Sequence, residues 1–233
     1  MNSREILVKM LDRVIERYWD ILPVDILASR ANAKSADYFA HVMLTMVSSF
    51  YRGYMDLLEF VFVFGDLISG QMRRAWYEGM EENQLTPMDM TDEWEAILQE
   101  IIDGEKSYIV DFADAIEAAR LAGNPIEPLM ARTELWLNRY LDVVNQAKLE
   151  TAEPKDKLVW RLGATEQHCS TCVALNGIVA SASEWEEVGF HPQGPENGML
   201  ECRGWRCDCS LDPTDERRTY DRMNRLYAIA TGG

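Results

Sequence analysis

All five cysteines of this 233-residue chain lie in its last third. They occur as a Cys-x-x-Cys pair, a single cysteine and a Cys-x-Cys pair. Cysteines that only fill a hydrophobic core would be scattered along the chain. Two close pairs separated by a loop can instead present four thiolates to one tetrahedral Zn²⁺, with each sulfur about 2.3 Å from the metal. The clustering therefore predicts a small C-terminal module held by a structural metal site.

Four of the cysteines form the symmetric ligand set that we predict for zinc: Cys169, Cys172, Cys207 and Cys209. Cys202 could replace one member of the second pair, because only a short loop separates it from Cys207. His168 and His191 are the other alternates. A histidine beside a cysteine pair, however, is more often a hydrogen-bond donor to the ligands or simply exposed. The sequence leaves the choice among these ligands open.

Two other uses of the cysteines compete with a metal site. Disulfides are common in small loop-rich modules, but an odd number of cysteines leaves one thiol unpaired. The residues after Met1 also lead into an amphipathic pattern, so we expect no secretory signal peptide. A thioredoxin-like redox pair would place Cys169 at the end of a strand within a βαβ unit, a pattern that the surrounding sequence lacks. Zinc is therefore the first prediction, with disulfides and redox thiols as alternatives.

The composition is that of a packed globular protein. Hydrophobic residues make up 47% of the chain, which is ample for a core. The most apolar stretch, 57–69, is interrupted by Glu59 and Asp66, so we expect no membrane span. The net charge of −16 weighs against a broad contact with nucleic-acid phosphates. A local basic run could contact a phosphate or an acidic partner surface, although such runs are usually solvated helix faces: Arg217, Arg218, Arg222 and Arg225.

Residues 1–152 predict a helical domain with several long helices. Apolar residues recur with i, i+3, i+4 spacing in four stretches. These stretches begin near Glu5, Ser35, Thr91 and Pro128. The third is expected to be one helix, capped by Thr91 and ended by Gly123. Their many Met, Trp and Phe residues predict packing of helix on helix, with faces that could also bind partner subunits.

The second stretch raises two questions about its conformation. It is expected to continue from Ser35 to Gln84, with a break at Gly65 or Gly70. The alternating Phe and Val residues at 60–64 could form a buried strand, but the helical context favours a buried helix centre.

Residues 153–212 predict a small module of a different kind. Asn176-Gly177 between apolar residues is typical of a β-hairpin turn. A segment of this size is marginally stable without a metal ion or a disulfide. Residues 213–233 are expected to form a short basic helical tail. The predicted fold class is therefore mainly α, with an N-terminal helical region of several long helices and a small C-terminal β-hairpin module of the zinc-binding type.

Four motifs follow one another over residues 158–211. They are Trp160-Arg-Leu-Gly-Ala-Thr-Glu-Gln-His-Cys-Ser-Thr-Cys172, Leu175-Asn-Gly177, the Pro-rich loop 189–198, and Cys202-Arg-Gly-Trp-Arg-Cys-Asp-Cys209. In this order they resemble the C-terminal module of minor head, or head-morphogenesis, proteins of Mu-like and related tailed bacteriophages. Many of those proteins close with His-Pro-Asn-Cys-Arg-Cys, whereas here His191-Pro192 lies well upstream and Cys202 is an extra thiol. The resemblance covers about a quarter of the chain directly.

The resemblance implies a low-copy structural protein and no enzymatic activity. Such a protein would assemble with the portal protein and capsid proteins in the host cytoplasm, and stay inside the head or at its portal vertex. Self-association and contact with packaged DNA are weaker expectations. Two other classes stay open: a zinc-ribbon-like nucleic-acid-binding or regulatory protein, and a Cys-x-x-Cys thiol oxidoreductase. A zinc hydrolase using Glu166 and His168 is a further enzymatic alternative.

Overall fold

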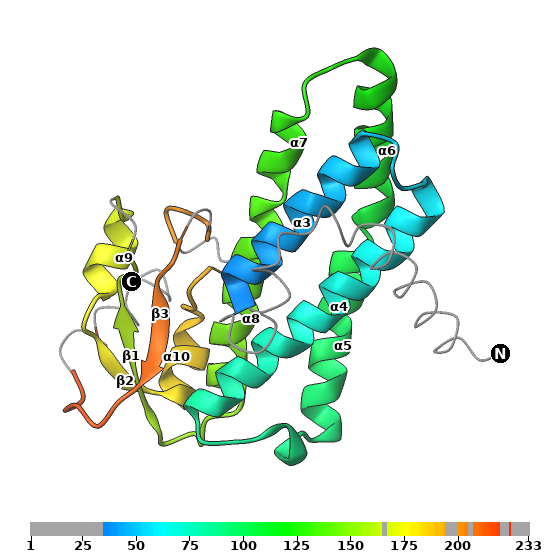
Figure 1. The fold of residues 1–233 in the computed structure, drawn as a ribbon. Coiled ribbons are helices and arrows are strands. Elements are labelled where there is room, and N and C mark those ends of the chain that lie inside the picture. Colours follow the sequence, from blue (N-terminus) through cyan, green and yellow to red (C-terminus); the bar gives the residue numbers. More distant parts are fainter. Residues whose placement is uncertain (1–34, 165–166, 194–199, 205–206, 220–223, 225–233) are drawn as a thin grey trace.

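The computed structural model describes residues 35–164, 167–193, 200–204, 207–219 and 224. The helix expected from Glu5 lies outside the described residues, as do Arg222 and Arg225. Over the described residues the protein is mainly helical and carries one small antiparallel sheet beside the long helices (Figure 1). This confirms the predicted mainly α class with a small C-terminal module that contains strands.

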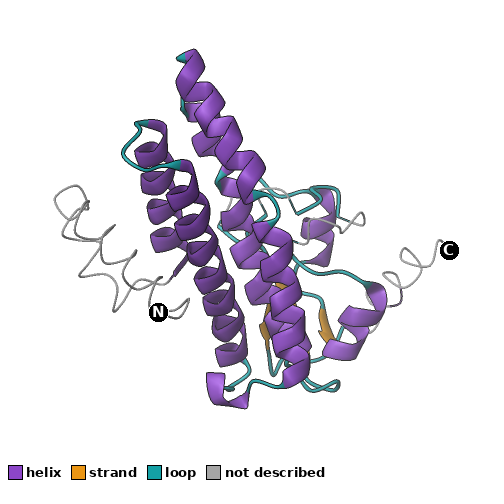
Figure 2. Ribbon diagram, turned by 90° about the vertical axis from the view of Figure 1, so that its right-hand side faces the viewer, coloured by secondary structure: helices purple, strands orange, loops and turns teal. Residues whose placement is uncertain are grey.

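The long helices precede the first strand, and short helices lie between the strands. The first group comprises α3 (Ser35–Tyr51), α4 (Leu57–Glu82), the 3₁₀ helix η1 (Pro87–Asp89), α5 (Asp92–Lys106), α6 (Ile109–Ala122), α7 (Glu127–Arg132) and α8 (Glu134–Glu150). The second comprises β1 (Lys157–Arg161), α9 (Ser170–Leu175), β2 (Val179–Ser181), α10 (Ala182–Val188) and β3 (Ser210–Pro213). Figure 2 shows the long helices running beside one another.

The centre of the helical domain is the pairing of α4 with α8, which is the most extensive contact between any two elements. An aromatic cluster fills the space beside it, with Trp136 of α8 lying 5.2 Å from Phe64 and 5.1 Å from Phe112 between ring centroids. The two helices approach closely at Gly79, where a Cβ atom would meet the carbonyl oxygen of Val144. The alternating Phe and Val residues at 60–64 lie inside α4, which confirms the predicted helix centre.

Two predicted helices are interrupted where the sequence analysis expected continuity. The stretch from Ser35 breaks between α3 and α4, and not at the glycines of α4. Gly53 adopts a left-handed φ of 75° there, and Asp56 caps α4 by accepting the N–H of Glu59 at 2.8 Å. The helix predicted from Thr91 to Gly123 is divided into α5 and α6.

The second break has a local cause in the side chains around it. The Ser107 hydroxyl donates to the carbonyl of Gly104 at 2.6 Å, a contact with the backbone that favours a helix end. The side chain of Tyr108, which follows the break, is 60% exposed, so it does not hold this part of the chain to the core. The predicted ends are confirmed: Thr91 accepts the N–H of Trp94 at 3.2 Å, and Gly123 terminates α6 with a φ of 68°.

The small sheet has the order β2-β1-β3, with antiparallel pairing on both sides of β1. Asn176-Gly177 does form a turn, in which the N–H of Ile178 donates to the carbonyl of Leu175 at 2.9 Å. This turn joins α9 to β2, however, so it is not the predicted turn between two strands of a β-hairpin. The short helix α9 lies in the connection between β1 and β2. The turn signal in the sequence did not predict this helix.

Residues 214–219 do not form the start of the predicted helical tail. Their backbone bonds to the sheet at two points: the N–H of Thr214 donates to the carbonyl of Lys157 of β1 at 2.9 Å, and the N–H of Thr219 donates to the carbonyl of Val179 of β2 at 3.0 Å. Backbone groups at the edge of a sheet need such partners, and this requirement outweighs the local helical preference. No helix among the described residues is long and apolar enough to span a lipid bilayer.

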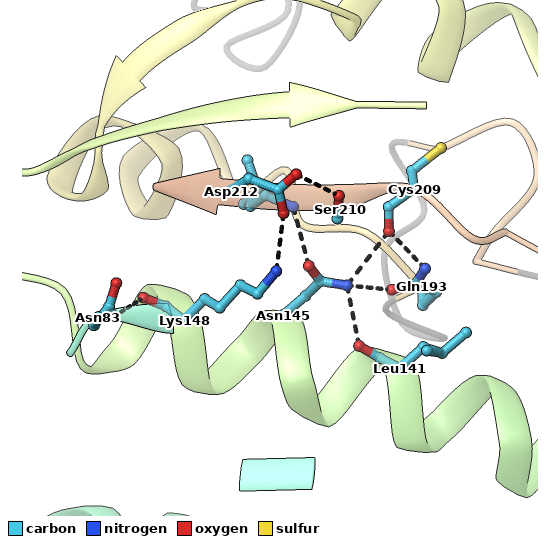
Figure 3. A network of polar contacts seen from close by, with 9 residues as sticks. Asn83, Leu141, Asn145, Lys148, Gln193, Cys209, Ser210 and Asp212 are labelled. Atoms are coloured by element: carbon cyan, nitrogen blue, oxygen red, sulfur yellow. Dashed lines mark hydrogen bonds and ion pairs between the residues drawn. The ribbon is translucent and has the colours of Figure 1, made fainter. Parts of the chain in front are cut away.

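The two parts of the protein meet along α8 through buried polar contacts (Figure 3). The amide of Asn145 donates to Gln193 Oε1 at 2.5 Å, and its Oδ1 accepts the N–H of Leu211 at 3.0 Å. Lys148 Nζ lies 2.9 Å from a carboxylate oxygen of Asp212 on β3. α8 therefore supports the helical core on one side and positions β3 on the other.

Candidate metal centre

The five cysteines come from three segments of the module. Cys169 is the N-cap of α9, and Cys172 lies in the first turn of that helix. Cys202 lies in the loop 200–204, while Cys207 and Cys209 immediately precede β3. All five belong to the described residues, and none of them forms a disulfide there.

The sulfur atoms form two groups of three that share Cys172. Within each group the sulfur atoms all lie within 4.8 Å of one another. The two groups are Cys169, Cys172 and Cys202, and then Cys172, Cys207 and Cys209. Cys172 Sγ and Cys207 Sγ are 3.9 Å apart. The structure thus brings all five thiols into one cluster, but the four predicted ligands do not form a single group at this separation.

Backbone N–H groups point at several of these sulfur atoms. The N–H of Cys172 lies 3.3 Å from Cys169 Sγ, and the N–H of Cys202 also donates to that sulfur. Gly204 donates its N–H to Cys202, within a turn where Arg203 and Gly204 have left-handed φ angles of 49° and 74°. Gly163 donates to Cys209, and a Cβ at Gly163 would collide with Asp208. Such N–H···S contacts favour thiolates over thiols.

The pKa values of the thiols are pushed in opposite directions. Contacts with the sulfur atoms of Cys172 and Cys207 lower the pKa of Cys209 to about 4, against the effect of burial. Burial raises the pKa of Cys202 to about 11. Contacts with Cys207 and Cys209 raise the pKa of Cys172 far above its ordinary value. Adjacent thiols therefore compete for the negative charge, and a bound cation would remove that competition.

The composition of the cluster fits a thiophilic metal. Each group offers only sulfur donors, which suit Zn²⁺ and other soft ions better than Mg²⁺ or Ca²⁺. Cys172, Cys207 and Cys209 are buried, and they pack in the same core as Trp160 and Trp185. The residues present could thus hold a metal ion whose binding is coupled to the packing of the module.

The histidine alternates lie outside both groups. His168 is half-buried next to Cys169 in the sequence. His191 Nδ1 lies 3.4 Å from the carboxylate of Asp142 on α8, so this imidazole faces the helical domain. Of the arginines, Arg217 is exposed and Arg218 forms an ion pair with Glu184 of α10.

A group of buried charged residues lies where the module meets the long helices, and no sequence motif marks this group. Asp142 is fully buried and pairs with Arg139, whose Nε lies 3.1 Å from Glu105. Burial raises the pKa of Glu105, and Arg139 opposes that shift. Arg139 and Asp142, together with Asn145 and Lys148, form a polar face on α8, which otherwise contributes to the core. That polar face is the one signal from which sequence reasoning could have placed the module against α8.

Comparisons of this chain with protein-family models, with curated proteins and with solved structures found no match.

Proposed function

We propose that the chain is a structural head-morphogenesis (minor head) protein of a tailed bacteriophage. It associates with the portal and capsid, and thiolate-bound zinc holds its C-terminal module. The four ordered motifs support this proposal, and so does the succession of long helices and a small cysteine module that the resemblance implies. The single observation that carries the metal-held module is the convergence of five thiols from three segments on one cluster, of which three members are buried.

The cluster lies where a metal would tie the module together. It connects the start of α9 to the loop 200–204 and to the residues before β3, which lie about thirty residues further along the chain. β3 in turn pairs with β1 and reaches α8 through Asp212 and Lys148. Zinc surrounded by thiolates contributes folding free energy and little reactivity. A structural role therefore explains the site without an enzymatic step.

The helical domain offers a surface for a partner subunit. Leu58 and Phe62 are one turn apart on α4 and are 79% and 42% exposed, and Tyr54 in the preceding turn is 51% exposed. Large apolar side chains that are grouped and exposed are typical of protein interfaces. We assign this surface to the portal protein.

Two measurements test the assembly role: detection of the protein in purified phage heads, and a binding assay with the purified portal ring. The protein is expected at low copy number in heads that contain the portal, and it is expected to bind the isolated ring. Leu58→Ser with Phe62→Ser should weaken that binding at least ten-fold, while Leu121→Ser, at another exposed apolar position, should leave it unchanged. Absence from heads together with no binding to the portal ring would contradict the proposed role.

A further inference from the structure

We propose that the five cysteines hold two thiophilic metal ions, zinc in the first instance, and that Cys172 bridges them. One ion would bind the first group of sulfur atoms, with Cys169 and Cys202, and the other would bind the second group, with Cys207 and Cys209. This inference rests on the proposed metal-held module and raises the number of metal ions per chain from one to two.

The spacing of the sulfur atoms favours two ions over one. In a tetrahedral zinc site with four thiolates, bonds of about 2.3 Å place every pair of sulfur atoms about 3.8 Å apart. The structure contains two groups of three within 4.8 Å and no such group of four among the described residues. A single tetrahedral site would therefore require one thiol to leave its group and join the other. Two sites that share Cys172 require no such movement, and a water molecule would complete each ion's coordination.

Cys172 lies between the two groups of sulfur atoms. Its Sγ contacts the sulfur atoms of Cys169, Cys207 and Cys209, with Cys207 at 3.9 Å. Backbone N–H groups donate to the other four cysteines, as is typical of thiolates that bind a metal. A bridging thiolate uses two lone pairs for two metal ions, so it must lie within reach of both. Cys172 occupies the position that a bridge requires.

Charge balance favours the same stoichiometry. A cysteine binds a metal ion as a thiolate, so a cluster in which all five cysteines bind carries five thiolate charges. Two divalent ions bound by five thiolates leave a residual charge of −1, whereas one ion bound by four thiolates leaves −2 and the fifth cysteine stays a neutral thiol. Three of the thiols are buried, and uncompensated negative charge is costly in such surroundings. The second ion would therefore reduce the residual charge inside the module.

The test counts metal ions in the full chain purified with zinc, using native mass spectrometry and elemental analysis. Two ions per chain are expected. Cys202→Ser should reduce the count from two to one, and Cys172→Ser should reduce it further, because each ion would retain only two sulfur ligands. Val173→Ser at an exposed position of α9 is the matched control and should retain two ions.

A measurement on the unsubstituted chain avoids dependence on whether the variants fold. Cadmium-substituted protein should give two NMR signals coupled to each other through the shared sulfur of Cys172. Two uncoupled signals would overturn the bridge. One metal ion per chain, unaffected by Cys202→Ser, would overturn this inference and leave the proposed single zinc site standing. A chain that binds no metal would contradict both.

Discussion

The two hydrophobic cores of this chain are held together in different ways. The helical core is built from long helices and closely packed aromatic side chains, including Phe64, Phe112 and Trp136. The core of the module is smaller, and three of its buried members are cysteines. Because small cores bury too little apolar surface to be stable alone, we expect the module to depend on its sulfur cluster and on α8. The helical domain, which contains α8, should not depend on the sulfur cluster.

Breaking the sulfur cluster should have the largest effect. Cys172→Ser removes the residue shared by both groups, and we expect the module to lose more than about 4 kcal/mol of stability because metal binding is lost with it. Unfolding of the module should then separate from that of the helices. Urea titration followed by near-UV circular dichroism measures this separation, because Trp160 and Trp185 lie in the module's core.

The matched control for this variant is Val173→Ser, since Val173 lies next to Cys172 on α9 and is 55% exposed. It should unfold like the unsubstituted protein. If Cys172→Ser also unfolds in one unchanged transition, the cluster does not stabilise the module.

A disturbance of the helical core should have the next largest effect. In Gly79→Ala the new Cβ would lie 2.6 Å from the Cβ of Ala147, so α4 and α8 must move apart at a cost of about 1–3 kcal/mol. Gly70→Ala is the control on the same helix, where a Cβ meets nothing within 4 Å and should stabilise by up to about 1 kcal/mol. Urea unfolding monitored by far-UV circular dichroism gives both values. Equal effects of the two substitutions would contradict the close approach at Gly79.

The contact between the two parts should be weakened by Asn145→Ala. This change leaves Gln193 and the N–H of Leu211 without their buried partner, at an expected cost of about 1–3 kcal/mol. In the variant, backbone amide hydrogen exchange should become faster at β3, and the increase should be smaller in α4. Gln99→Ala, at an exposed position of α5, should leave the exchange rates at both β3 and α4 unchanged. Faster exchange in α4 with none at β3 would show that Asn145 serves the helical core instead.

The smallest effect is expected at a surface ion pair within the helical domain. Arg73 contacts both carboxylate oxygens of Glu95 at 2.6 Å, and its guanidinium lowers the pKa of that carboxyl. Both side chains are partly exposed, so Glu95→Gln should cost at most about 1 kcal/mol at neutral pH.

The pH dependence of this cost follows from the direction of the pKa shift. Because the folded pKa of Glu95 is below its unfolded value, the pair stabilises fully above the ordinary glutamate range. That contribution is lost as the pH falls through the folded pKa. Urea unfolding at pH values above and below this range should show the variant and the unsubstituted protein converging in acid. A difference that persists in acid would mean that the carboxylate charge is not its cause.

The sequence was most informative where a feature is local. The caps at Thr91 and Gly123 and the helical state of 60–64 could be predicted, because each depends on residues within one or two turns. The clustering of the cysteines in the chain also predicted a clustering in space. The break at Ser107 was not predicted, because the regular spacing of apolar residues continues past it. A single hydroxyl contact with the backbone favours a helix end there.

Long-range contacts explain the remaining differences. Residues 214–219 do not begin a helix because backbone N–H groups of Thr214 and Thr219 bond to Lys157 and Val179, which lie far earlier in the chain. Asn145 and Gln193 are 48 residues apart, and neither belongs to a motif that would announce their pairing. The grouping of the thiols around Cys172 likewise depends on how three segments fold together. Spacing along the chain gave the ligand candidates but not their geometry.

The most direct test of the metal-held module is hydrogen exchange of the natively purified chain before and after treatment with a strong zinc chelator. Chelation should release metal and abolish protection at Val159 and Trp160 of β1, while the amides of α4 remain protected. Unchanged protection of β1, with no metal released, would contradict the claim that a metal bound to these cysteines holds the module together.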